Sequence, residues 1–274
     1  MIGRQIRELQ TFVPFLPVFK FSAWNFVSAK FGWRIDRDFQ FLSRLRPFNL
    51  ALDIGGNWGQ SIIALRRTAD PRRILSFEPN QMLAARLASR YRDDPSVEVQ
   101  ACGLGDEPGQ FPLYVPFYRN YEFDGLASID PLEAFTYFNE KRMARFDRGK
   151  LPSRSINVTV RCLDEFELAP DIVKMDVQGL ELQVVRGGYE TFRRHRPVTI
   201  IENPPKELVD LLGRCGLEPY HYDGECLSPY RWQWKNALFL TREHLALSGI
   251  ATRNIPAPSP AAALTLAGAA LPRS

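Results

Sequence analysis

Histidine is scarce in this chain and cysteine is thinly spread. Only three histidines occur among the 274 residues, which excludes a histidine-rich metal site. No two cysteines form a Cys-x-x-Cys pair, so the sequence carries no zinc-finger signature. The cysteines are Cys102, Cys162, Cys215 and Cys226.

Long apolar stretches and runs of one charge are missing as well. No stretch reaches the roughly 18 apolar residues of a membrane-spanning helix, and no signal peptide is visible. A net charge of +4 is too small to indicate a nucleic-acid partner. With 45% hydrophobic and 24% charged residues, the composition is that of a globular protein. We therefore expect a protein of the reducing cytoplasm. The sequence gives no indication of the oligomeric state.

The chain also lacks the Gly-x-Gly-x-x-Gly turn that places helix amides against a pyrophosphate. In its place, two glycines directly follow the short apolar run of residues 50–54, and a helix pattern follows Gly59. Asp53, which we expect at the end of this strand, would repel a phosphate and suits a cationic ligand. S-adenosylmethionine carries a sulfonium and an ammonium group and no phosphate. The motif Asp53-x-Gly55-x-Asn57-x-Gly59 therefore predicts the cofactor turn of a class I methyltransferase.

Two later segments add to this cofactor site. Residues 74–77 form a second strand pattern that ends in Glu78 and Pro79, 25 residues after Asp53. An acid at this place holds a ribose diol in Rossmann-type sheets. A third strand, at 97–101, runs into Gly103 and Asp106. We expect Asp106 to reach the adenine amino group, although a turn aspartate is an equal alternative.

The remaining patterns complete an α/β protein with a Rossmann-like class I methyltransferase fold. We expect a doubly wound, mostly parallel, seven-stranded sheet with an antiparallel terminal strand. Further strands are predicted at 156–161, 172–175, 198–201, 220–222 and 237–240. The methyltransferase domain would span 47–245. An Ala/Pro-rich tail, 246–274, is expected to be disordered.

Two segments do not fit the sheet pattern. Residues 1–46 are rich in Phe and Trp and are predicted to form a helical N-terminal extension. Packing on the sheet is the simplest role for this extension. A lid over the substrate, or a peripheral membrane contact with a lipid-linked substrate, are the alternatives. The insertion at about 110–155 is interpreted as a substrate-recognition surface, because long insertions in compact domains usually serve function.

With these segments in place, the chain resembles the FkbM family of S-adenosylmethionine-dependent methyltransferases. The resemblance covers about residues 50–240, and its family-specific piece is Lys-Met-Asp-Val-Gln-Gly-Leu-Glu, residues 174–181. It implies methylation of a hydroxyl on a sugar, glycolipid or natural product. The family usually has Glu where this chain has Gln178, which weakens any role of that acid here.

Removal of the hydroxyl proton requires a base. Asp176 ends the fourth parallel strand, Glu181 lies near the next helix start, and Glu202 ends the following strand. We expect these acids to converge as catalytic residues, with Lys174 as an alternative proton acceptor or electrostatic clamp. Alternatively, Asp176 and Glu181 would hold a divalent cation that acidifies the hydroxyl. The simpler interpretation of each acid is a loop or helix-start carboxylate.

Three alternative functions fit the sequence less well. Asn203-Pro204-Pro205 resembles the motif of amino-group methyltransferases, but it follows the fifth strand and Lys206 replaces the aromatic residue. A nicotinamide-dependent oxidoreductase would require the missing glycine pattern. A non-catalytic module that kept the fold is the third alternative, against which the intact Asp53 and Glu78 argue.

Overall fold

The computed structural model describes residues 35–118, 121–123, 126–136, 138, 153–232 and 234–253, together with Asn25, Val27, Ser28, Lys30 and Gly32. Within these residues, no helix has the length and apolar character needed to cross a membrane. The aromatic residues of the predicted N-terminal extension lie almost entirely outside this part of the chain, as does the tail beyond residue 253.

The main sheet has nine strands in the order β13-β11-β10-β12-β9-β8-β1-β2-β3. The strands of its parallel half are β3 (Val97–Gln100), β2 (Arg73–Phe77), β1 (Leu50–Ile54), β8 (Ile172–Met175) and β9 (Val198–Glu202). The other half consists of β12 (Asn236–Leu240), β10 (Glu218–Tyr222), β11 (Cys226–Pro229) and β13 (Ala251–Thr252). β12 runs antiparallel to both β9 and β10. The predicted doubly wound sheet is confirmed, and β11 and β13 widen it beyond the seven strands expected.

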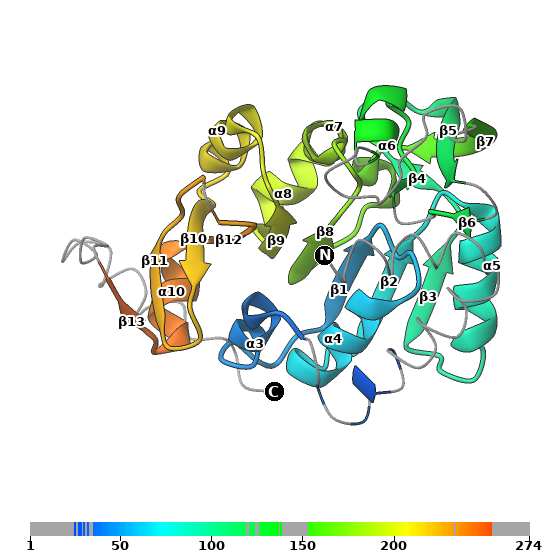
Figure 1. The fold of residues 1–274 in the computed structure, drawn as a ribbon. Coiled ribbons are helices and arrows are strands. Elements are labelled where there is room, and N and C mark those ends of the chain that lie inside the picture. Colours follow the sequence, from blue (N-terminus) through cyan, green and yellow to red (C-terminus); the bar gives the residue numbers. More distant parts are fainter. Residues whose placement is uncertain are drawn as a thin grey trace, which may run out of the picture.

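Apolar residues alternate along the strands and produce two hydrophobic cores, one on each face. Ala51 and Ile172 pack with the first core, under α3 (Arg37–Leu42), α4 (Gln60–Thr68), α5 (Gln81–Arg90) and α10 (Arg242–Ser248). Leu52 and Val173, one residue further along, pack with the second core, under α7 (Glu181–Gly187), α8 (Tyr189–His195) and α9 (Lys206–Arg214). Helices on both faces of a parallel sheet leave its carboxyl edge open for a site (Figure 1).

The insertion forms a second, four-stranded sheet of its own. Its order is β4-β7-β5-β6, with β4 (Gly103–Leu104), β7 (Ser153–Arg161), β5 (Gly109–Tyr118) and β6 (Tyr121–Glu122). Figure 1 shows this small sheet, in green, above the carboxyl ends of β1 and β2. A short helix, α6 (Pro131–Thr136), packs against β5, and a 3₁₀ turn (Leu163–Phe166) follows β7.

The ordered domain extends past the predicted boundary at residue 245. Helix α10 starts after Thr241, which accepts a hydrogen bond from the His244 amide at 3.1 Å, and continues to Ser248, where Gly249 ends it with a φ of +62°. β13 then pairs with β11. The expectation of a disordered tail from residue 246 is therefore wrong for residues 246–253, and the rest of the tail lies outside the described residues.

Candidate active site

The turn after β1 is shaped by close contact with the turn after β8. The Gly55 amide and the Gly56 amide both donate to the Phe77 carbonyl, at 3.0 and 3.1 Å. Gly55 has a φ of +87°, and a Cβ built on it would lie 2.1 Å from the Asp176 carbonyl oxygen. Only glycine fits both constraints. The predicted tight turn is present, and it brings the carboxyl ends of β1 and β8 together.

Asp53 supports this turn from within the sheet. It is the fourth residue of β1 and is fully buried, so its predicted place at the strand end is wrong. One carboxylate oxygen accepts a hydrogen bond from Ser76 Oγ at 2.8 Å, and the other lies 4.0 Å from Lys174 Nζ. All three residues are directly paired across β2, β1 and β8. We conclude that Asp53 holds the strand ends together rather than forming a cavity wall.

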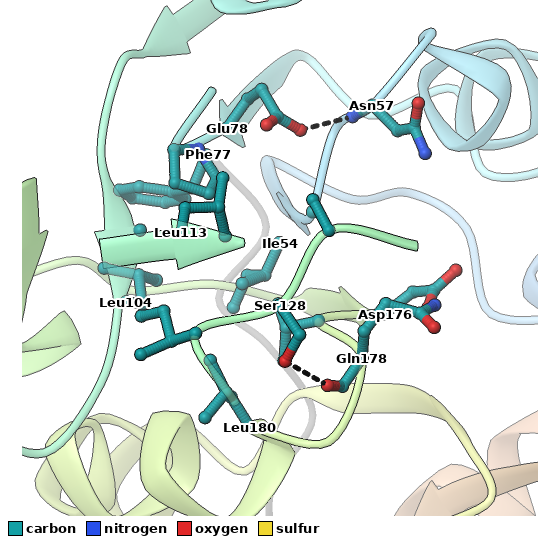
Figure 2. Close-up of a pocket in the computed structure, with 16 residues that line it drawn as sticks. Ile54, Asn57, Phe77, Glu78, Leu104, Leu113, Ser128, Asp176, Gln178 and Leu180 are labelled. Atoms are coloured by element: carbon teal, nitrogen blue, oxygen red, sulfur yellow. Dashed lines mark hydrogen bonds between the residues drawn. The ribbon is translucent and has the colours of Figure 1, made fainter. Parts of the chain in front are cut away.

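A first cavity of about 700 Å³ opens at the carboxyl ends of β1 and β2 (Figure 2). Five predicted cofactor residues line it: Gly55, Asn57, Glu78, Pro79 and Gly103. Glu78 is 5% exposed, and its carboxylate accepts hydrogen bonds from the Asn57 amide at 2.7 Å and the Asn80 amide at 2.9 Å. Backbone donors therefore fix the carboxylate at the cavity wall.

Part of the insertion forms the opposite wall. Leu113 on β5 lines the cavity, as do residues 127–129. Ser128 exchanges two backbone hydrogen bonds with Tyr114, and its hydroxyl donates to the Gln178 carbonyl at 3.0 Å. Figure 2 shows this bond joining the insertion to the turn after β8. No motif marks Ser128, because its role depends on contacts between residues far apart in the chain.

A second cavity, of about 1000 Å³, lies on the α3 and α4 face of the same edge. Gly55, Asn57 and Asp176 line both cavities, so these residues form the partition between them. The remaining walls of the second cavity bring together distant segments: Ser28, Ile35, Asp36 and Phe39, then Gly56, Gln60, Ser61 and Ala64, then Lys174, Met175, Ile200, Glu202, Lys235 and Asn236.

The predicted catalytic acids are only partly brought together. Asp176 has a side chain that is 36% exposed, receives a hydrogen bond from Gln178 Nε2 at 2.7 Å, and lies 3.8 Å from Lys174 Nζ. Glu202 lines the second cavity with Asp176 and pairs with Lys235 at 2.8 Å. Asp176, Lys174 and Glu202 thus share one cavity, as expected.

Glu181 is the exception to the predicted convergence. It is buried, and its carboxylate accepts the Val177 and Gly179 amides, both at 3.1 Å. Burial raises the pKa of this carboxyl above its usual value. The carboxylate lines neither of the two cavities and caps the turn, so the expectation that it joins Asp176 is wrong.

The donor set also fails to support the divalent cation that was considered for Asp176 and Glu181. Across the described residues, no group of three or more His, Cys, Asp or Glu side chains is arranged to hold a metal ion. Gln178 contributes to this lack of a metal-binding group, because its neutral side-chain amide donates a hydrogen bond to Asp176. A glutamate at this position, as the FkbM resemblance implies for relatives, would place a second carboxylate beside Asp176 instead.

Asp106 does not reach the first cavity. It is exposed, lies 3.9 Å from Arg186 Nη1, and lines a neighbouring smaller cavity. Its predicted contact with the adenine amino group would require the ring to extend from the first cavity into this neighbouring one, and stays a prediction. The first cavity nevertheless fits a nucleoside. Its apolar walls, including Phe77 and Leu104, suit a flat ring, and the buried Glu78 carboxylate suits a ribose diol.

Known protein families and solved structures include proteins that are similar to this chain. The family model described as "Methyltransferase FkbM domain" matches residues 53–217. A crystal structure of methyltransferase FkbM from Methylobacillus flagellatus KT aligns with 70% of this chain at 18% identity and a TM-score of 0.43. The alignment covers 43% of that chain, so the present chain spans less than half of its length.

A second solved structure is precorrin-6y C5,15-methyltransferase from Geobacter metallireducens GS-15. It aligns with 73% of this chain and 82% of its own, at 14% identity and a TM-score of 0.34. No curated protein matches the chain. The family model covers more than half of the chain and spans β1 to the end of α9. This chain therefore belongs to the FkbM methyltransferase family.

Proposed function

We propose that this protein is an S-adenosylmethionine-dependent O-methyltransferase. The observation that carries the proposal is the meeting of two cavities at Gly55, Asn57 and Asp176. The nucleoside end of the cofactor would occupy the first cavity, with Glu78 toward its ribose. When bound, the cofactor supplies a methyl group on a sulfonium sulfur. The acceptor would enter from the second cavity, so that its hydroxyl comes to the partition.

Asp176 is the residue that we propose as the base. Its carboxylate lies at the partition and is accessible from the second cavity. The Gln178 amide and the Lys174 ammonium, 2.7 and 3.8 Å away, would hold its orientation. Orientation matters because alignment of the reacting atoms contributes much of the rate in group transfer. Lys174 is 13% exposed and lies between Asp53 and Asp176, which supports a role as electrostatic clamp rather than proton acceptor.

The polar walls of the second cavity support a hydroxyl-rich acceptor, such as a sugar, glycolipid or natural product. Gln60, Ser61 and Asn236 offer neutral hydrogen-bonding groups, and Lys235 is neutralised by Glu202. Phe39 adds an apolar surface. The four free cysteines support a reducing compartment. Peripheral membrane contact through the aromatic N-terminus remains a prediction for residues that lie outside the described part of the chain.

The test is transfer of an isotopically labelled methyl group. The enzyme is incubated with labelled S-adenosylmethionine and panels of glycans, glycolipids and natural products, and the products are analysed by mass spectrometry. We expect a labelled methyl ether on one acceptor class. A labelled methyl on nitrogen would replace the O-methylation proposal with the amino-group alternative.

A further inference from the structure

A third, smaller cavity abuts the first one. It has a volume of about 410 Å³, opens to solvent, and lies between the turn after β4 and the start of α7. Leu104, Ile129 and Leu180 line both this cavity and the first one. A flat ring held among these three side chains in the first cavity would therefore present its far edge to the third cavity.

Gln183 is the unusual residue in this third cavity. It is the third residue of α7, and its Oε1 atom is buried without a hydrogen-bond partner among the described residues. A buried carbonyl oxygen without a donor costs free energy. Phe111, Val160 and the three shared side chains make the surrounding wall largely apolar. The two carboxylates on the wall, Asp106 and Glu107, are acceptors and cannot satisfy a carbonyl oxygen. A bound molecule that carries a donor would supply the missing partner.

We propose that Gln183 recognises the amino edge of the cofactor's adenine, and this inference rests on the proposed function. The exocyclic amino group of adenine is a donor, and the adjacent ring nitrogen is an acceptor. A glutamine side chain matches that pair with its carbonyl oxygen and its NH₂ group, as it does for adenine in nucleic acids. Gln183 thus takes the role that the sequence suggested for Asp106, which is exposed and lies beside Arg186.

The test measures recognition of the base rather than turnover. S-adenosylhomocysteine is compared with its purine-riboside analogue, in which a hydrogen atom replaces the amino group, so that the ring nitrogen stays an acceptor and only the donor is lost. Calorimetry should show that the wild-type protein binds the adenosyl compound about 5- to 150-fold more tightly, the usual discrimination of a bidentate contact. Gln183→Met keeps the length of the side chain and removes the amide, so most of this preference should disappear.

Two further variants keep the test interpretable. Gln183→Glu retains an acceptor for the amino group and should retain a preference for the adenosyl compound. Gln110→Met makes the same substitution at a glutamine that bonds Thr159 on the outside of the small sheet, and should behave like the wild type. Thermal unfolding confirms that each variant is folded. If Gln183→Met does not fold, the Gln183→Glu result decides: loss of the preference in that variant overturns the inference.

The possible failures are distinct. If the wild-type protein binds neither compound, the proposed function itself is contradicted. If it binds S-adenosylhomocysteine, and Gln183→Met binds both compounds with wild-type affinities, only the assignment of Gln183 is wrong. Equal wild-type affinity for the two compounds would also overturn this assignment while leaving the cofactor site intact.

Discussion

The two cavities that meet at Asp176 are built from different kinds of interaction. In the first cavity, backbone amides fix the polar side chains: Glu78 accepts from Asn57 and Asn80, and the neighbouring turn is held by Glu181 in the same way. In the second, side chains hold one another, as in Lys174 with Asp176, Lys235 with Glu202, and Asn236 with Asp38.

This difference suits the two ligands. A cofactor that is the same in every cycle is best met by donors that the backbone has already oriented. Pairs of side chains at a half-exposed surface are weaker and can separate when a ligand offers better partners. The first cavity should therefore behave as a rigid site and the second as an adaptable one. Some substitutions should perturb both cavities, and others should perturb only the first or only the second.

Asp176→Asn should have the largest effect. Asparagine keeps the volume and can still accept from Gln178, but it loses the negative charge at the partition. Turnover should fall by about 10²–10⁴, the contribution of a positioned base, while S-adenosylhomocysteine affinity changes little. Steady-state kinetics and calorimetry measure the two effects. Asp210→Asn, at an exposed position on α9, is the matched control. Wild-type turnover in Asp176→Asn would remove this carboxylate from the mechanism.

Gly55→Ala should damage both cavities at once. The added methyl would lie 2.1 Å from the Asp176 carbonyl oxygen, at a φ of +87° that L residues avoid. The free energy of unfolding should fall by about 2–4 kcal/mol, and cofactor binding should be lost. Gly213→Ala in α9 meets nothing within 4 Å and should be neutral or stabilising by about 0.5–1 kcal/mol. Equal denaturation midpoints for the two variants would argue against the packed turn.

Glu78→Gln should damage the first cavity alone. Both carboxylate oxygens accept backbone amides, so an amide side chain must set its NH₂ group against one of these donors. Cofactor affinity should weaken by about 1.5–3 kcal/mol, the value of hydrogen bonds to a charged group. Glu98→Gln, on the exposed side of β3, should bind normally. An unchanged dissociation constant for Glu78→Gln would show that this acid does not hold the ribose.

Asn236→Ala should damage the second cavity alone. Its amide donates to Asp38 at 3.0 Å, and burial raises the pKa of that carboxyl above its usual value. Loss of the donor should destabilise the fold by about 1–3 kcal/mol and raise the KM for the acceptor, while S-adenosylhomocysteine affinity is kept. A parallel loss of cofactor affinity would mean that the two cavities are not independent.

Glu181→Gln should have the smallest effect, visible mainly in pH dependence. Because burial raises its folded-state pKa above the unfolded value of 4.5, the associated stability is present below pH 4.5 and is lost as the pH rises through the folded-state pKa. The glutamine variant lacks this loss. Melting temperatures of the two proteins across pH 4–8 should therefore shift relative to one another, in favour of the variant at higher pH. Parallel curves would contradict a raised pKa.

Local motifs explain why much of the first cavity could be predicted from the sequence. Gly55, Glu78 and Gly103 follow strand patterns directly, and the carboxyl ends of parallel strands meet at one edge. Asp53 was misplaced by one position, because an apolar run does not mark the last residue of a strand. The carboxylate of Glu181 was misassigned because its partners are amides of its own turn, which no sequence pattern distinguishes from a catalytic role.

The second cavity could be predicted only in part. Asp176 and Glu202 end strands and were found, but Phe39, Lys235 and Asn236 come from segments without a motif. They meet because α3 packs against α4 and β12, and β12 pairs with β9. Gln183 was missed for a similar reason, since the burial of its side-chain oxygen arises only in the folded protein, where the small sheet lies beside α7. Long-range packing, rather than local pattern, decides these positions.

Binding calorimetry of the wild-type protein with S-adenosylmethionine and, separately, with NADH tests the central claim most directly. The first cavity has the buried Glu78 carboxylate in its wall, and the sequence lacks the glycine pattern of a pyrophosphate turn. We predict binding of S-adenosylmethionine at one site per chain and no measurable heat with NADH. Binding of NADH in its place, or of neither compound, would contradict the account of this site.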